Sequence, residues 1–246
     1  TQMVGREVLM RVEKDPARPA GGGLAFEDVS LLGAGGVPLL DRVSFDVPRG
    51  EIVAVAGVQG NGQTELAEVI LGLQTPDSGV IRLEDADITR AKPRESLDAG
   101  VGFIPEDRST DGIIASFSIA DNLVLDQFRS SSFSAAGSLK RGAIARNARE
   151  KETEYDIRLT SIEDPVSSLS GGNQQKVVVA REMSRDLTLL VANQPTRGVD
   201  VGSIEFIHRR IVDVRDQGCA VLLISSELDE VVSLADRIAV MYRGRI

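Results

Sequence analysis

The chain has 246 residues, of which 42% are hydrophobic and 26% are charged, so its length allows one large or two modest globular domains. Its formal net charge of −9 argues against a nucleic-acid partner, because such a partner requires clustered Lys and Arg. No apolar run reaches the ~18 residues of a membrane span. The single cysteine, Cys219, excludes a disulfide framework and predicts a core thiol in a reducing compartment.

The N-terminal stretch "EKDPARPAGGG", residues 13–23, combines charge with two prolines and three glycines. This composition resists packing and favours an extended connector. We therefore expect residues 1–23 to comprise the tail of a preceding domain and a linker. The main domain is expected to cover residues 24–246 and to begin near Leu24.

The first buried strand is predicted at "EIVAVAG", residues 51–57, because of its β-branched apolar run. A glycine-rich loop follows, and then a helix from about Gln63 to Leu71 with Gly72 as its C-cap. Further strands are predicted in "TPDSGVIRLE", "VGFIP", "LTLLVA" and "CAVLLIS".

A helix is predicted between the last two strands, where apolar side chains recur at spacings of three and four, at Ile204, Ile207, Ile211 and Val214. His208 falls on this helix, and we expect it to have a surface or packing role. Strands alternating with helices predict an α/β fold with a mainly parallel sheet covered on both faces. Residues 129–168 are Ser-rich, then charged and helical, with no convincing strand, and they indicate an inserted helical subdomain.

The stretch "GVQGNGQT", residues 57–64, has the frame of a phosphate-binding loop. Its glycines let successive backbone N–H groups turn inward on phosphates at the start of a helix. Where such a loop has a lysine, this one has the neutral Gln63, whereas Thr64 can still offer a hydroxyl to a metal ion. Losing a charged hydrogen bond is expected to weaken nucleotide affinity and hydrolysis together. The alternative is a merely tight turn between a strand and a helix.

A second anion site is predicted in "SSLSGGNQQKVVVARE", residues 167–182. Ser170, Gly171 and Gly172 come directly before a predicted helix, so that backbone amides and a hydroxyl gather at its positive end. Taken alone, a Ser-Gly-Gly sequence is also a common way to cap a helix.

Downstream stand "NQPTRGVDVG" and "CAVLLISSELDEVVSLADRIAV", and with these motifs the chain resembles the ATP-binding domain of an ABC transporter over about residues 24–246. The resemblance implies a P-loop NTPase core with a mainly parallel sheet, an antiparallel β subdomain and a helical subdomain at about residues 107–185. It implies that ATP, with a weakly held Mg²⁺ at Thr64, binds at Gly57, Gly60, Asn61, Gly62, Gln63, Thr64 and Glu65. The family signature corresponds to Leu169–Asn173, and the D-loop aspartate corresponds to Asp200.

Several positions depart from the chemistry of that family. The magnesium-ordering aspartate corresponds to Asn193 and the general-base glutamate to Gln194, and neither amide accepts a proton at neutral pH. The Q-loop position corresponds to Glu106, whose charge would repel a γ-phosphate unless a metal ion lies between them, and the switch histidine corresponds to Ser226. No aromatic residue stands near Gly33, where the family stacks adenine. With Gln63, these departures predict a degenerate ATP site.

In the family two such domains pack head to tail, and each nucleotide lies between one domain's phosphate loop and the other's signature. The resemblance therefore implies that Ser170, Gly171, Gly172, Asn173 and Asp200 serve ATP bound to a partner. "PEDRSTDGIIASFSIADNLVL" and "QPTRGVDVGSIEFIH" resemble the second domain of tandem importers of simple sugars and nucleosides, and "MVGREV" resembles the end of the first.

The resemblance also implies the partners and the location of the chain. The expected partners are a first ATP-binding domain in the same polypeptide, transmembrane permease subunits and, indirectly, an extracytoplasmic solute-binding protein. The chain would then be peripheral on the cytoplasmic face of the membrane, with no nucleic acid bound. Two alternatives stay open, namely a soluble ABC protein of translation or DNA repair and a regulatory nucleotide-binding module.

Overall fold

The computed structural model describes residues 12–246, and the segment "MVGREV" lies outside the described residues. The described chain divides into two compact units. The core unit comprises residues 12–103, 186–194 and 208–246, and the helical unit comprises residues 104–185 and 195–207.

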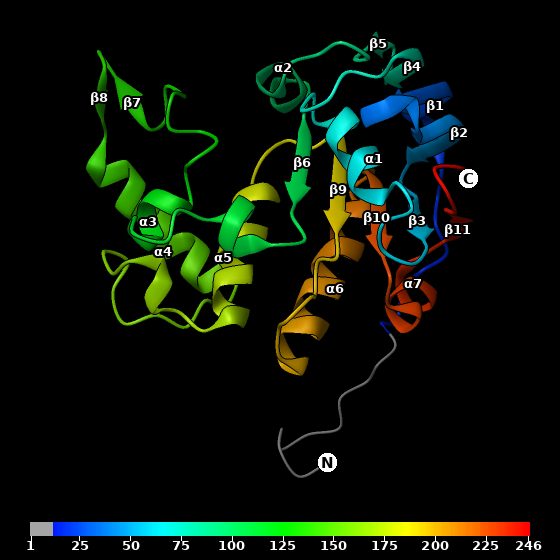
Figure 1. The fold of residues 1–246 in the computed structure, drawn as a ribbon. Helices are drawn as coiled ribbons and strands as arrows, with labels where there is room; N and C mark the ends of the chain where they lie inside the picture. Colours follow the sequence, from blue (N-terminus) through cyan, green and yellow to red (C-terminus); the bar gives the residue numbers. More distant parts are fainter. Residues whose placement is uncertain (1–11) are drawn as a thin grey trace. The chain divides into compact units, whose positions relative to one another are not determined.

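A mainly parallel sheet forms the centre of the core unit (Figure 1), and its strands follow the order β11-β3-β10-β9-β6. The strands are β3 (Ile52–Ala56), β6 (Val101–Ile104), β9 (Leu189–Asn193), β10 (Ala220–Ser225) and β11 (Arg237–Val240). The pairs β11–β3, β3–β10 and β10–β9 are parallel. All residues of β9 and β10 are buried, which is why these strands read as unbroken apolar runs.

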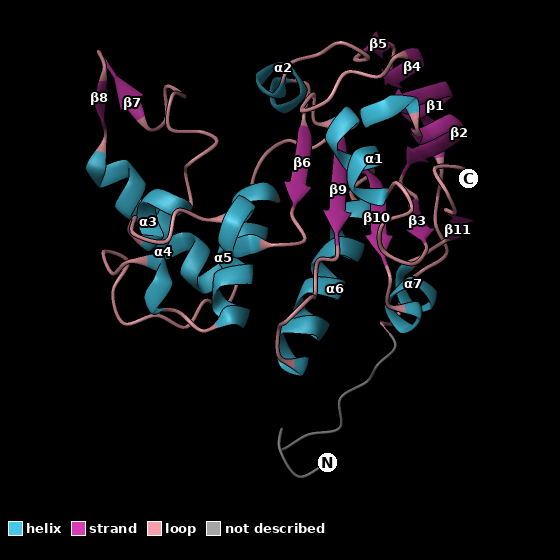
Figure 2. Ribbon diagram, viewed as in Figure 1, coloured by secondary structure: helices cyan, strands magenta, loops and turns pink. Residues whose placement is uncertain are grey.

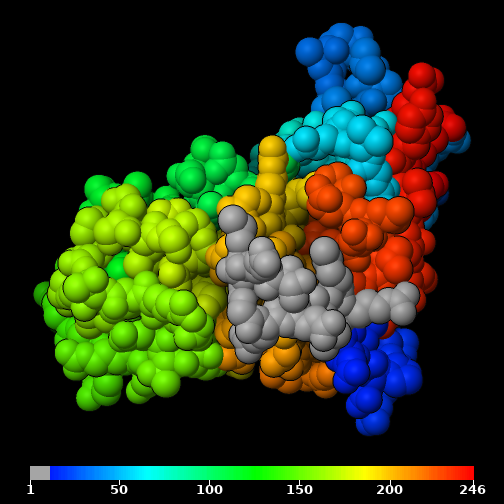
Figure 3. Space-filling model, turned by 90° about the horizontal axis from the view of Figure 1, so that it is seen from below, coloured from blue at the N-terminus to red at the C-terminus, as the bar shows by residue number. Residues whose placement is uncertain are grey.

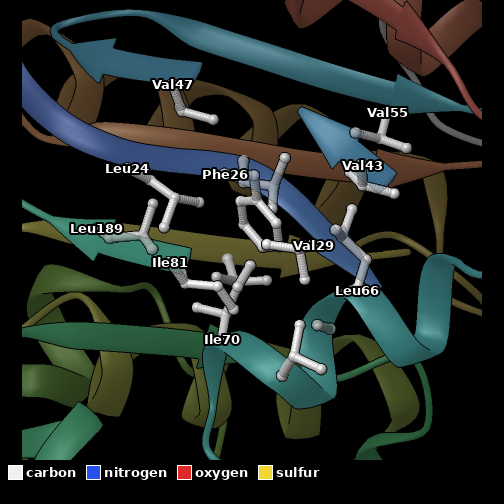
Figure 4. Packing of buried hydrophobic residues seen from close by; sticks show 14 of the residues in the cluster. Leu24, Phe26, Val29, Val43, Val47, Val55, Leu66, Ile70, Ile81 and Leu189 are labelled. Carbon is white, nitrogen blue, oxygen red and sulfur yellow. The ribbon is translucent and has the colours of Figure 1, made fainter. Parts of the chain in front are cut away.

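A second sheet of the core unit is antiparallel, in the order β2-β1-β4-β5. It is built from β1 (Ala20–Leu32), β2 (Pro38–Arg49), β4 (Ser78–Leu83) and β5 (Ala86–Asp87). With the parallel sheet it confirms the expected α/β P-loop fold with an antiparallel subdomain. The two sheets and the first helix share one cluster of buried side chains, which includes Phe26 (Figure 4). The partly buried Phe45 packs against this cluster and stacks on Phe26 with ring centroids 5.0 Å apart.

The first strand starts at Ala20, inside the segment that the sequence analysis assigns to a linker, so the expected start near Leu24 is four residues too late. Gly22 and Gly23 adopt φ of +87° and +96°, which shift the register of the strand rather than end it. Before it, the Lys14 ammonium donates 2.6 and 2.9 Å bonds to the carbonyls of Leu234 and Ala235. This segment, dark blue in Figure 3, is therefore held on the core unit.

Three α-helices lie entirely within the described part of the core unit, and Figure 2 shows them in cyan. They are α1 (Gln63–Ile70), α2 (Pro93–Asp98) and α7 (Leu228–Leu234). The end of α1 agrees with the expected cap, because Gly72 adopts φ +71° just beyond the helix. Its amide donates to Val69 and the amide of Leu73 donates to Glu68, which is the hydrogen-bond pattern of a Schellman motif.

The helical unit contains α3 (Ile119–Asn122), α4 (Arg141–Glu154), α5 (Gly171–Glu182) and the first residues of α6 (Val201–Asp216). It also contains a two-residue hairpin, β7 (Ser134–Ala135) with β8 (Ser138–Leu139), in a stretch where the sequence predicts no strand. The turn at Ala136 and Gly137, both with positive φ, carries that hairpin, and strands this short give no period-2 pattern to detect. Along α6, Ile207, Ile211 and Val214 are buried, as the apolar stripe predicts.

None of the helices within residues 12–246 is both long enough and apolar enough to span a bilayer.

Candidate functional site

The parallel register places three expected site segments along one edge of the main sheet. Ala56, the last residue of β3, pairs with Ser225, and Asn193, the last residue of β9, pairs with Ile224. The glycine loop follows β3, Gln194 follows β9 and Ser226 follows β10. The carboxyl ends of parallel strands are where ligands bind in open α/β sheets.

The glycine loop has the backbone conformation that its sequence predicts. Gly60 and Gly62 adopt φ of +84° and +111°, a backbone region that residues with a Cβ rarely adopt. Gly62 caps α1, and its carbonyl accepts the first helical bond from the Leu66 amide at 2.9 Å. The loop therefore ends directly in a helix N-terminus, as an anion site requires.

The side chain of Gln63 folds back into its own loop and is only 7% exposed. Its Oε1 accepts a hydrogen bond from the Asn61 amide at 3.0 Å, and its Nε2 donates to the Val58 carbonyl at 3.0 Å. A methyl group on Gly57 would lie 2.7 Å from Nε2, so this glycine makes room for the glutamine. The sequence indicates a missing lysine but not this inward bonding.

A turn near the C-terminal end supports the loop from behind. The Asn61 side chain accepts a hydrogen bond from the Arg243 amide at 2.9 Å, and its carbonyl accepts one from the Gly244 amide at 2.8 Å. The Gly244 carbonyl in turn accepts from the Asp41 amide at 2.8 Å. Residues of β2, the turn and the loop are thus joined by backbone hydrogen bonds.

The residues around this edge suit a divalent cation poorly. Thr64 is exposed and presents a hydroxyl, while the two positions expected to correspond to carboxylates are the amides Asn193 and Gln194, both buried. Magnesium prefers carboxylate and phosphate oxygens over neutral amides. Any Mg²⁺ here would depend mainly on the nucleotide's own phosphates.

Gln194 and Ser226, which the sequence analysis assigns to the general-base and switch-histidine positions, lie in direct contact. The Gln194 Nε2 donates to the Ser226 hydroxyl oxygen at 3.0 Å, and the Gln194 amide donates to the Ile224 carbonyl at 2.8 Å. Gln194 has φ +49°, a left-handed conformation that is strained for a residue with a Cβ. Two neutral groups bonded to each other cannot remove a proton from water.

The turn between β1 and β2 contains Gly33, near which the sequence analysis expects an adenine-stacking position without an aromatic residue. Gly33 precedes a short 3-10 turn, Ala34–Gly36, and a methyl group on Gly33 would lie 3.0 Å from the Leu39 side chain. The apolar side chains flanking this turn, Leu32 and Val37, are exposed and aliphatic.

The signature segment lies in the helical unit, where Ser170 precedes α5. Ser170 is extended, with ψ 157°, and its side chain does not cap the helix. Instead its hydroxyl oxygen accepts a bond from Asn173 Nδ2 at 3.0 Å. The hydroxyl is exposed and its proton remains available to an anion, so the structural-cap alternative does not account for this serine.

Close packing accounts for the two glycines of the signature. A methyl group on Gly171 would lie 2.5 Å from Arg108 Nη2, and one on Gly172 would collide with Asp200 and Ser203. The start of α5 therefore touches both an arginine side chain and the start of α6.

Arg108 is a candidate residue that the sequence analysis does not single out. Its guanidinium donates to the carbonyls of Arg197 and Gly198 at 3.1 and 3.3 Å. A second link joins the same segments, because Arg197 forms an ion pair with Glu106. Glu106, expected at the Q-loop position, therefore has an arginine as its partner within the same unit.

Asp200, the expected D-loop aspartate, also starts α6. It accepts hydrogen bonds from the Ser203 amide at 3.1 Å and the Ser203 hydroxyl at 2.8 Å. Burial raises the pKa of Asp200, but the hydrogen bonds from Ser203 and from the Asp200 and Gly202 backbone together outweigh it, so the pKa lies below its usual range. Asp200 stays ionised and caps the helix.

Two residues of the core unit are structural, as expected. His208 is buried, with Nε2 3.0 Å from Glu230 Oε1, which links α6 to α7. Cys219 is buried and unbonded to another cysteine, and burial raises the pKa of its thiol to about 12.

Comparison with known proteins gives one family. The sequence pattern described as "ABC transporter" matches residues 40–197. The guanosine import ATP-binding protein NupO of Bacillus subtilis is 44% identical over 99% of this chain and 48% of its own length. The nucleoside import ATP-binding protein NupA of Lactococcus lactis is 46% identical over 99% and 48%, and the ribose import ATP-binding protein RbsA 2 of Rubrobacter xylanophilus is 41% identical over 99% and 46%. The chain spans about half the length of these relatives.

Solved structures support the same fold. A dimeric ATP-binding cassette in a post-hydrolysis state with ADP and phosphate superposes with a TM-score of 0.77 and 20% identity, covering 91% of this chain and 96% of that chain. A nucleotide-free ATP-binding cassette from an ABC transporter gives 0.75 and 22%, covering 92% and 89%.

Proposed function

Because the chain belongs to the ABC transporter family, we propose that it is an ATP-binding domain of an importer for nucleosides or simple sugars and that its signature completes an ATP site on a partner domain. The relatives support the solute class, because they are import ATP-binding proteins for guanosine, nucleosides and ribose. The partner is a first ATP-binding domain in the same polypeptide, which agrees with a chain about half as long as those relatives.

One contrast supports the proposal that this domain assists hydrolysis at the partner's ATP site and hydrolyses little ATP at its own. The signature is ready to bind an anion, because the Ser170 hydroxyl is exposed and does not cap α5. The chain's own catalytic positions, by contrast, are occupied by Gln194 and Ser226, which bond to each other. Placed donors stabilise a transferring phosphoryl group even when the chemistry is done elsewhere. The chain therefore hydrolyses little ATP itself and supports hydrolysis at the partner's site.

The proposed setting is the cytoplasmic face of a membrane. The domain would bind permease subunits directly and a solute-binding protein indirectly, with ATP and a weakly held Mg²⁺ at its own site. The alternatives predict different behaviour. A soluble ABC protein of translation or DNA repair would bind RNA or DNA in a salt-dependent way, and a regulatory module would copurify without permeases.

The test is a serine-to-arginine pair in the natural polypeptide, reconstituted with its permease. Ser170→Arg is expected to lower ATP turnover and solute uptake by more than about a hundredfold, as removal of a placed donor does in other enzymes. Ser167→Arg is the matched control, because Ser167 is also exposed and lies in the same segment. Turnover that survives Ser170→Arg would contradict the composite-site proposal.

A further inference from the structure

The phosphate loop already contains an acceptor bound to one of its own amides. In loops of this kind the inward-facing backbone N–H groups donate hydrogen bonds to phosphate oxygens. Here the Asn61 amide is bonded to Gln63 Oε1 at 3.0 Å. A side-chain amide oxygen and a phosphate oxygen are both acceptors with two lone pairs, so they compete for that N–H.

The second half of the Gln63 amide strengthens this arrangement. Its Nε2 donates to the Val58 carbonyl at 3.0 Å, so the side chain joins two points of the loop. Gln63 is 7% exposed. Its Nε2 fits beside residue 57 only because that residue is a glycine, since a Cβ there would lie 2.7 Å from Nε2. The side chain therefore lies within the loop and is not extended into solvent.

From this geometry we propose that Gln63 is an internal placeholder for a phosphate group: its Oε1 occupies the Asn61 amide until a nucleotide displaces it. The proposal rests on the function proposed above only in taking ATP as the ligand of this loop. ATP binding is then weak for two reasons. The loop has no lysine charge, and an acceptor of the chain itself occupies the amide that a phosphate oxygen would use.

The direction in which Gln63→Ala changes ATP affinity distinguishes a competitor of phosphate from a residue that binds the nucleotide. If Gln63 competes with phosphate, Gln63→Ala removes the competitor and tightens ATP binding by about three- to tenfold, the range that the loss of one or two ordinary hydrogen bonds gives. If Gln63 binds the nucleotide, the same substitution weakens binding. Gln63→Met keeps the length of the side chain but cannot accept from the Asn61 amide, and it is expected to act like Gln63→Ala while preserving the packing.

The measurement is hydrogen–deuterium exchange of the peptide covering residues 57–64 in the natural polypeptide, titrated with ATP, which reports this site even when another ATP site is present. Without nucleotide, both variants are expected to exchange faster in this peptide, and with ATP they should reach half-protection at a lower concentration than wild type. Gln217→Ala, an exposed glutamine at the end of α6, is the control and is expected to match wild type.

Weaker ATP binding in both variants, or an affinity within twofold of wild type, would overturn the placeholder role. If Gln63→Ala fails to fold, Gln63→Met alone decides, by the same criteria. A failure of the function proposed above is detected by a different measurement. It appears as normal ATP turnover in Ser170→Arg, and it does not alter the exchange difference between the Gln63 variants and wild type at residues 57–64.

Discussion

The Nε2 of Gln194 donates a 3.0 Å hydrogen bond to the hydroxyl oxygen of Ser226 and joins the ends of the two neighbouring strands β9 and β10. These positions are assigned in the sequence analysis to a general-base glutamate and a switch histidine, whereas here two neutral side chains bond to each other. The pair therefore contributes to the stability of the sheet edge and not to proton transfer.

A double-mutant cycle on this pair tests that role. Gln194→Ala and Ser226→Ala are each expected to lower the free energy of unfolding, with a coupling of roughly 0.5–1.5 kcal/mol, as an ordinary hydrogen bond gives. ATP turnover of the natural polypeptide is expected to stay within about twofold of wild type in all three variants. A tenfold loss of turnover in Gln194→Ala would assign catalysis to this half of the protein.

Removing the Arg108 guanidinium is expected to loosen the segment before α6. Arg108 donates to two successive carbonyls, and charged hydrogen bonds contribute about 1.5–3 kcal/mol. Arg108→Ala should speed amide exchange at residues 196–200 and lower turnover by about tenfold, with partial recovery in Arg108→Lys, which retains one charged donor. Arg94→Ala removes an exposed arginine whose ion pair stays within α2, and it serves as the control. Equal turnover in Arg108→Ala and Arg94→Ala would show that Arg108 does not position the signature.

Asp200 is expected to matter for stability as well as for ATP. Asp200→Ala removes the acceptor for Ser203 and should lower the free energy of unfolding by about 1 kcal/mol, whereas Asp200→Asn keeps an oxygen there and should lose less. Because the pKa of Asp200 is lowered in the folded chain, its charged contribution is present above the unfolded pKa of about 3.9 and is lost as the pH falls through the folded pKa. Urea titrations at several pH values would show the difference between wild type and Asp200→Asn shrinking in acid.

The Cys219 thiol is expected to resist alkylation until the chain unfolds. With its pKa raised to about 12 by burial, the thiolate fraction at pH 8 is about a thousandfold smaller than in an unfolded chain, where the pKa is about 8.5. The stabilising preference for the neutral thiol is complete below pH 8.5 or so and declines as the pH rises toward the folded pKa. The free energy of unfolding of wild type should therefore fall more between pH 8.5 and 10.5 than that of Cys219→Ala. Rapid labelling of the native chain with a thiol reagent would contradict this.

The strands, the glycine loop and the signature could be predicted because each depends on a few residues that are neighbours in the sequence. The apolar runs of β3, β9 and β10, and the glycines around α1, are local signals that depend on backbone geometry alone. The antiparallel subdomain was expected only from the family resemblance, and the fold confirms it, whereas the order of the strands was not predicted.

The contacts that complete the candidate sites could not be predicted in this way. The pair Arg197–Glu106 joins residues 91 positions apart, and the bond from the Arg243 amide to Asn61 joins residues 182 apart. The inward rotamer of Gln63 depends on space left by Gly57. A sequence pattern names the residues at such positions but does not say which long-range partner each one finds.

The turn behind the phosphate loop has a thermodynamic consequence. Through Gly244, backbone hydrogen bonds connect Asn61 to Asp41, so the loop is fixed before any ligand arrives. Ordering a flexible backbone costs about 1–2 kcal/mol per residue in conformational entropy. A triphosphate arriving here therefore meets a backbone that is already ordered, so the main rearrangement on binding is the displacement of the Gln63 side chain.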